Sequence, residues 1–174
     1  FKLVSINTAR FDVTKHLATP VISDAKIGLL ELSKALGDWR APNNWYERSI
    51  DERKKWDSYV EKQSGPTNQE LPSYAHAVGA VYRNADPSDI VVTAAGGLVG
   101  EVVQIWKPKE LNTFETEWGF SCMGYEISGA LGIKMAKPDQ DVVVFVGDGS
   151  YLLHNSDIYS SVLYDKKLII VVCD

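Results

Sequence analysis

Apolar residues along this chain form short continuous runs that alternate with longer segments of helical periodicity. Short apolar runs are typical of strands, and the periodic segments are typical of amphipathic helices. In the second part of the chain this pattern predicts strands at about 90–93, 113–115, 141–146 and 167–173, and helices at about 69–83, 98–106, 125–136 and 150–164. Strands that alternate with helices indicate a parallel sheet with right-handed crossovers, and therefore an α/β fold.

The first part of the chain contains one strand-and-helix unit of the same kind. Residues 1–7 predict a strand, and residues 25–36 predict an amphipathic helix. After a break at residues 42–44, a charged helix is expected over residues 49–62, and residues 63–68 have the composition of a linker. The charged helix could be a docking face, but a solvated helix anchored by a few aromatic residues is the better interpretation.

These elements predict three segments. Residues 1–40 are expected to be the C-terminal part of a central α/β domain, residues 41–68 a helical linker, and residues 69–174 the N-terminal part of a second, doubly wound domain. The chain starts inside a predicted strand without a methionine and ends on another apolar strand, so we expect it to be a piece of a longer polypeptide.

The composition narrows the classes of partner. The chain of 174 residues has 18 Lys and Arg against 23 Asp and Glu, which gives a formal net charge of −5. An acidic chain without a basic stripe argues against a nucleic-acid or membrane partner. Its longest apolar runs are far shorter than the roughly 20 residues of a membrane helix. Cys122 and Cys173 cannot build a disulfide framework and show no zinc spacing, so a cytoplasmic location is expected.

The segment with the clearest chemistry is Gly147-Asp148-Gly149-Ser150, which lies between a very apolar strand and a helix. Open α/β sheets bind ligands at the carboxyl ends of their strands. The two glycines would let backbone N–H groups face an anion, and the start of the helix would add its positive dipole end. Asp148 would supply a hard oxygen ligand, which suits Mg²⁺ beside phosphates. These residues predict a diphosphate that a divalent ion bridges to the protein.

A plainer interpretation exists for the same residues, because Asp-Gly is a common turn and many strand-to-helix turns contain glycine. The position of these residues at the end of an apolar strand favours ligand binding over a simple turn. A second apolar strand ends at Asp174, and adjacent parallel strands bring their carboxyl ends side by side. A residue directly after Asp174 could then complete the metal site that Asp148 begins.

Gly147-Asp148-Gly149, followed by a second apolar strand, resembles the signature of thiamine-diphosphate-dependent enzymes. In that family an Asp and an Asn bind the metal; Asp148 matches the Asp, and the Asn would follow Asp174. Residues 118–132 resemble the segment that holds the aminopyrimidine ring, and residues 94–97 match a loop near the cofactor. The resemblance implies thiamine diphosphate and Mg²⁺ as cofactors, and a doubly wound diphosphate-binding domain after the end of a second α/β domain.

The resemblance also implies roles for individual residues. Met123 would support the bent conformation of the cofactor, although a methionine beside a glycine is also common in cores. The carbonyl of Ser121 would accept a hydrogen bond from the pyrimidine amine; many relatives have Gly at this position. The residues expected to bind the cofactor are Gly96, Gly97, Ser121, Cys122, Met123, Gly147, Asp148, Gly149 and Ser150, and Asp148 is also the expected metal ligand.

None of the residues is expected to be catalytic, because the family's glutamate lies outside this chain. His154 follows the glycine-rich turn and could face the site, but a structural role is the better interpretation. The resemblance also implies a homo-oligomer, either a dimer or a tetramer. By itself the chain is expected to show no turnover.

Residues 117–127, 93–97 and 154–157 are most similar to the trihydroxycyclohexane-1,2-dione hydrolases of inositol breakdown. This similarity implies hydrolysis of a C–C bond in a cyclic 1,2-diketone, which gives a 5-deoxy-glucuronate. An acetolactate-synthase-like carboligase, or a 2-keto-acid or malonic semialdehyde decarboxylase on the same scaffold, is the first alternative. A non-catalytic nucleotide-binding module is the second, although the sequence has no GxGxxG or Walker motif.

Overall fold

The computed structural model describes residues 2–174. It divides into two compact units, one that extends to Asp51 and one that runs from Glu52 to Asp174. Helix α3 (Asn43–Ser64) contains the division. Within residues 2–174, no helix combines the length with the hydropathy that crossing a bilayer demands.

The first unit contains a two-stranded parallel sheet and short helices. Its elements in chain order are β1 (Val4–Asn7), α1 (Arg10–Val13), a 3₁₀ turn (Lys15–Leu17), β2 (Thr19–Ile22) and α2 (Ala25–Leu36). Asp24 begins α2, because its carboxylate accepts the backbone N–H groups of Lys26 and Ile27 at 3.0 and 3.2 Å.

The strand and the amphipathic helix that the sequence predicts for this unit are confirmed. β1 lies within residues 1–7, of which Phe1 lies outside the described residues, and α2 spans residues 25–36. β2 is an additional strand that the sequence analysis did not predict. It is only four residues long and includes Pro20, which lacks a backbone N–H to donate, so it gives a weak strand signal.

The second unit is built on a four-stranded parallel sheet with the strand order β4-β3-β5-β6. After α3 its elements in chain order are α4 (Tyr74–Asn84), β3 (Ile90–Thr93), α5 (Gly96–Ile105), β4 (Phe114–Thr116), α6 (Tyr125–Ala136), β5 (Val142–Gly147), α7 (Asp148–His154), α8 (Ser156–Leu163) and β6 (Ile169–Cys173). The chain moves from β3 to an edge strand, returns past β3 to β5, and then continues to the other edge. The direction of winding therefore reverses between β3 and β5.

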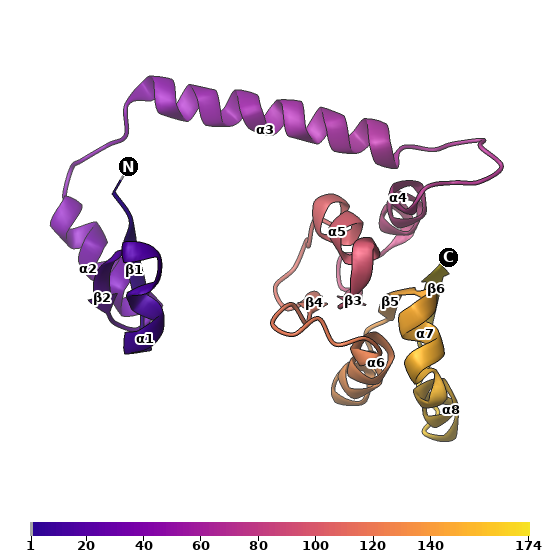
Figure 1. Cartoon of the computed structure of the whole chain (residues 1–174). Helices are drawn as coiled ribbons and strands as arrows, with labels where there is room; N and C mark the ends of the chain where they lie inside the picture. The colour runs from indigo at the N-terminus through magenta and orange to yellow at the C-terminus, as the bar shows by residue number, and fades with distance from the viewer. Residues whose placement is uncertain (1) are drawn as a thin grey trace. The chain divides into compact units, whose positions relative to one another are not determined.

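Alternate residues of β5 enter two separate cores, because successive side chains of a strand point to opposite faces of a sheet. Val143 and Phe145 pack with residues of α4 and α5, whereas Val142, Val144 and Val146 pack with residues of α6. Figure 1 shows α5 and α6 on opposite sides of this sheet. The doubly wound α/β fold that the sequence predicts is therefore confirmed.

The first turns of two helices differ from the sequence prediction. α3 begins at Asn43, so the expected break at residues 42–44 is wrong for its last two positions. α4 begins at Tyr74 instead of near residue 69. Pro72 disfavours helix in the residue before it, and the Ser73 hydroxyl then caps α4 by accepting the backbone N–H of His76 at 3.3 Å.

The single helix expected over residues 150–164 is wrong, because the structure has two helices there, α7 and α8. A turn at Asn155 separates them. The Asn155 carbonyl accepts the N–H of Ile158, three residues further on, which is the spacing of a 3₁₀ turn and not of an α-helix. The break ends α7 at His154. In the sequence, the one indication of this break is a single asparagine, which only weakly disfavours a helix.

Candidate functional site

The candidate site lies at the carboxyl edge of the second sheet, where β3 and β5 run side by side. β3 ends at Thr93, and β5 ends at Gly147. The neighbours of this pair are β4 on one side and β6 on the other, so the winding of the sheet reverses at this point. Loops diverge at such a point and leave the crevice that open α/β sheets use for ligands.

The turn after β5 places the glycine-rich segment at this edge. Gly147 is extended, with φ −74° and ψ 160°, and α7 begins at the next residue. The Asp148 side chain is exposed, and its carboxylate has no hydrogen bond or ion pair with any other residue from 2 to 174. The first N–H groups of a helix also lack intrahelical acceptors. A free carboxylate beside such N–H groups suits a metal-bound anion.

Met123 lies against this turn. A Cβ added to Gly149 would lie 3.2 Å from Met123 Cε, so a side chain at position 149 would displace the methionine. The Met123 side chain is 47% exposed, which is unlike a methionine that fills a core. The structure therefore brings together two of the residues that the sequence assigns to the cofactor.

The loop before Met123 is held in shape by Glu117. Its carboxylate accepts the backbone N–H of Phe120 at 2.9 Å and that of Cys122 at 2.8 Å. These hydrogen bonds, first that of Cys122 and then that of Phe120, lower the pKa of Glu117. Between them Ser121 adopts φ 52°, a conformation that favours glycine. Glu117 is a site residue that the sequence analysis did not single out.

Acidification is expected to loosen this loop. The folded pKa of Glu117 is lowered, so the stabilisation by its hydrogen bonds is complete above the ordinary glutamate pKa of about 4.3. It is lost as the pH falls through the lower folded value. Hydrogen-exchange protection factors of the Phe120 and Cys122 amides should therefore drop in this range. The E117Q variant, which does not titrate, should lack this drop; an equal drop in the variant would contradict the assignment.

Gly124, at the end of the same loop, packs against His154 of α7. It has φ 95°, and a Cβ at this position would overlap the His154 side chain, with His154 Cγ only 2.9 Å away. The absence of a side chain at position 124 therefore lets α6 and α7 approach closely. His154 packs against this glycine, as a structural role for the histidine would require.

Glu126 lies behind the loop, on the first turn of α6, and its side chain is 0% exposed. Its Oε1 accepts the backbone N–H of Ala95 at 3.1 Å, and its Oε2 accepts that of Gly124 at 2.9 Å. The sequence analysis missed this residue. The available signal was an acidic residue within a helix that is otherwise mostly apolar or small.

Gly96 and Gly97 are the first residues of α5, not part of a loop as expected, and both are exposed. A Cβ added at either of them, or at Gly147, would meet no atom within 4 Å. Open space therefore lies in front of the backbone after β3 and at the end of β5. At the end of neighbouring β4, the buried Thr116 hydroxyl has no hydrogen-bond partner among the described residues.

These residues fit one end of a magnesium–diphosphate complex. Mg²⁺ binds phosphates with one or two protein carboxylates, and Asp148 offers one without a competing partner among residues 2–174. Gly147 leaves open space beside it, Gly149 lies against Met123, and Ser150 is buried at 4% exposure. Within residues 2–174, no cluster of three or more His, Cys, Asp or Glu side chains forms a complete metal site.

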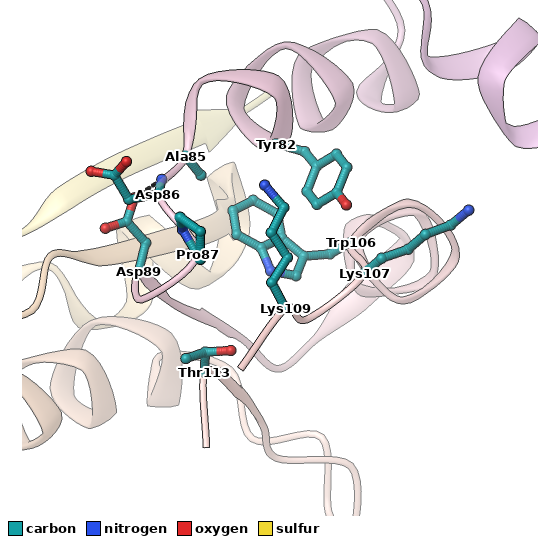
Figure 2. Close-up of a pocket in the computed structure, with 9 residues that line it drawn as sticks. All are labelled: Tyr82, Ala85, Asp86, Pro87, Asp89, Trp106, Lys107, Lys109 and Thr113. Carbon is teal, nitrogen blue, oxygen red and sulfur yellow. Dashed lines mark hydrogen bonds between the residues drawn. The ribbon is translucent and has the colours of Figure 1, made fainter. Parts of the chain in front are cut away.

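A small pocket lies at the opposite edge of the sheet, near the amino ends of β3 and β4 (Figure 2). Tyr82 and Trp106 pack edge to face there, with ring centroids 5.4 Å apart, and Lys109 lies over the Tyr82 ring at 5.5 Å. The cavity measures about 10 Å³, which is room for about one water molecule. It is separate from the site at the carboxyl edge.

Residues 94–174 match the sequence model of a family described as thiamine pyrophosphate enzyme, C-terminal TPP binding domain. Several curated relatives carry the name 3D-(3,5/4)-trihydroxycyclohexane-1,2-dione hydrolase. The relative from Geobacillus thermodenitrificans is 34% identical over 197 residues, which cover 99% of this chain and 30% of the relative. The relative from Lacticaseibacillus casei is 33% identical over 199 residues, with 99% and 30% coverage. The relative from Shouchella clausii is 34% identical over 196 residues, with 98% and 30% coverage.

The chain thus spans about 30% of the length of these curated relatives. The matched family segment contains every residue that the sequence analysis assigns to the cofactor, from Gly96 to Ser150.

Proposed function

We propose that this chain carries part of the active site of a thiamine-diphosphate-dependent C–C hydrolase. The reason is that residues 94–174 belong to the family of thiamine pyrophosphate enzyme C-terminal TPP-binding domains. Domains of this family bind thiamine diphosphate. The proposed substrate is a cyclic 1,2-diketone, trihydroxycyclohexane-1,2-dione, and the similarity to relatives named as hydrolases of this compound supports that choice. The observation that carries the proposal is that Met123 lies against Gly149, in the turn that also bears the free Asp148 carboxylate, at the switch point of the sheet.

The two ends of the cofactor would be held by different segments. Asp148 would bind Mg²⁺, and the backbone of residues 147–150 would face the diphosphate. Gly96 and Gly97 would leave room beside it after β3. At the ring end, Met123 would support the cofactor, with Cys122 beside it, and the carbonyl of Ser121 would accept a hydrogen bond from the pyrimidine amine.

Bound thiamine diphosphate supplies the electron sink that breaking a C–C bond next to a carbonyl requires. The residues of this chain orient that group and limit its movement. Glu117 contributes indirectly, because its carboxylate fixes the loop that presents Ser121 and Met123. No residue of this chain is assigned as a catalytic acid or base.

The protein that carries this sequence is expected to open the cyclic dione only with both thiamine diphosphate and Mg²⁺ present. Complete removal of both should lower the rate by at least about 1,000-fold, which corresponds to loss of the cofactor's entire contribution. Mass spectrometry of the ring-opened acid measures the reaction.

The same preparation should be assayed with pyruvate. Acetolactate formation without dione opening would favour the carboligase alternative, and equal dione opening after removal of both cofactors would refute the proposal. A protein that binds nucleotides, but neither thiamine diphosphate nor the dione, would favour the non-catalytic module.

Other features of the whole protein stay predictions. We propose a cytoplasmic homo-oligomer, with its segments divided near residues 40 and 68. The two compact units divide within α3, between Asp51 and Glu52. Cys122 and Cys173 are free thiols, Cys122 exposed and Cys173 buried.

A further inference from the structure

The side chain of Glu126 connects two segments that are far apart in the sequence. One carboxylate oxygen accepts the N–H of Ala95, directly before Gly96, and the other accepts the N–H of Gly124, directly after Met123. Both segments carry residues of the proposed cofactor site. Glu126 therefore links the backbone after β3 with the loop that carries Met123.

The link is shielded from water. Glu126 is 0% exposed, and Ala95 is 7% exposed. A backbone N–H that loses its acceptor in such a place cannot easily exchange it for water, so the loss costs more than at a surface. The carboxyl group of Glu126 is therefore a strong restraint on the two segments it joins.

We propose that Glu126 is a positioning residue, which sets the separation between the Gly96–Gly97 backbone and the Met123 loop and thereby the conformation of the bound cofactor. This role rests on the proposed function of the site. Both Glu126 oxygens are occupied by backbone N–H groups and the side chain is fully buried, so it would act through the two loops, without touching the cofactor.

Glutamate is the residue type that this geometry requires. Its two oxygens accept one N–H each, whereas glutamine would replace one oxygen with an amide N–H₂ and set two donors against each other. Aspartate keeps both oxygens but is one methylene shorter, so it cannot reach Ala95 and Gly124 together. α6 has its own anchors in the core, Ile127 and Ala130, so the loss of Glu126 should loosen the loops without unfolding the sheet.

The test compares E126Q and E126D with E101Q in the full protein. Glu101 lies on α5, outside the proposed site, and E101Q makes the same change of residue type there. Hydrogen exchange of the Ala95 and Gly124 amides without cofactor reports the link itself. Titration with thiamine diphosphate at saturating Mg²⁺ measures the cofactor affinity. Near-UV circular dichroism of the bound aminopyrimidine reports the conformation of the bound cofactor.

In E126Q we expect faster exchange at both amides, about tenfold weaker cofactor binding and a changed dichroism signal, with kcat still reduced when the cofactor is saturating. E126D should lose protection at one of the two amides and fall between E126Q and the wild type. E101Q should match the wild type throughout.

Two results would overturn the role: unchanged amide protection in both Glu126 variants, or lost protection with unchanged cofactor affinity and dichroism. The D148A variant distinguishes a failure of the positioning role of Glu126 from a failure of the proposed function. If D148A binds thiamine diphosphate as tightly as the wild type, the proposed site fails and the positioning role fails with it. If D148A binds weakly but E126Q binds normally, only the positioning role fails.

Discussion

Replacing Asp148 with alanine is expected to weaken the binding of thiamine diphosphate with Mg²⁺ by about 100-fold, because the metal would lose the carboxylate that this chain offers it. The same change should alter the free energy of unfolding by less than about 0.5 kcal/mol, since the side chain is exposed and has no partner among residues 2–174. Calorimetric titration of the apoprotein and thermal unfolding without cofactor measure the two quantities separately.

The matched control is D139A. Asp139 is an exposed aspartate between α6 and β5, at the opposite edge of the sheet, so its replacement should change neither cofactor affinity nor stability. D148N keeps an oxygen ligand without the charge and should bind with intermediate affinity. Wild-type affinity in D148A would mean that the turn after β5 does not hold the metal, and the cofactor would have to bind elsewhere.

The central sheet was predictable because its signals are local. β5 consists almost entirely of β-branched and aromatic residues, which are fully or almost fully buried. Such a run predicts a strand covered on both faces. The end of the run at Gly147 also locates the carboxyl edge, and with it the expected ligand site. The pattern indicates parallel strands, but the order β4-β3-β5-β6 depends on pairing across long stretches of chain and had to come from the structure.

The residues that shape the site were less predictable. Glu126 lies in the first turn of a helix, where an acidic residue is adequately explained by the helix dipole alone. Its partner Ala95 lies on another loop, and no periodicity relates the two positions. Glu117 similarly accepts N–H groups of residues three and five positions later, in a loop without regular structure. Hydrogen bonds of this kind depend on the folded path of the backbone.

The change from Gly124 to alanine is expected to destabilise the second unit by about 2–4 kcal/mol. The positive φ of 95° costs an alanine about 1–2 kcal/mol, and the added Cβ must also displace His154. Because Met123 directly precedes Gly124, a shift of the loop should also disturb the contact of Met123 with Gly149 and weaken cofactor binding. Urea unfolding of the wild type and the variant measures the first effect, and cofactor titration measures the second.

Gly132, within the helix that Gly124 precedes, provides the control. A Cβ at Gly132 would meet no atom within 4 Å, and alanine is favoured over glycine inside a helix, so G132A should stabilise the protein by about 0.5–1 kcal/mol. The double variant G124A/H154A separates the two costs at position 124. Removal of the histidine ring should recover part of the steric cost but none of the backbone cost. If G124A is as stable as the wild type, the close approach of α6 and α7 at this glycine does not hold the loop in place.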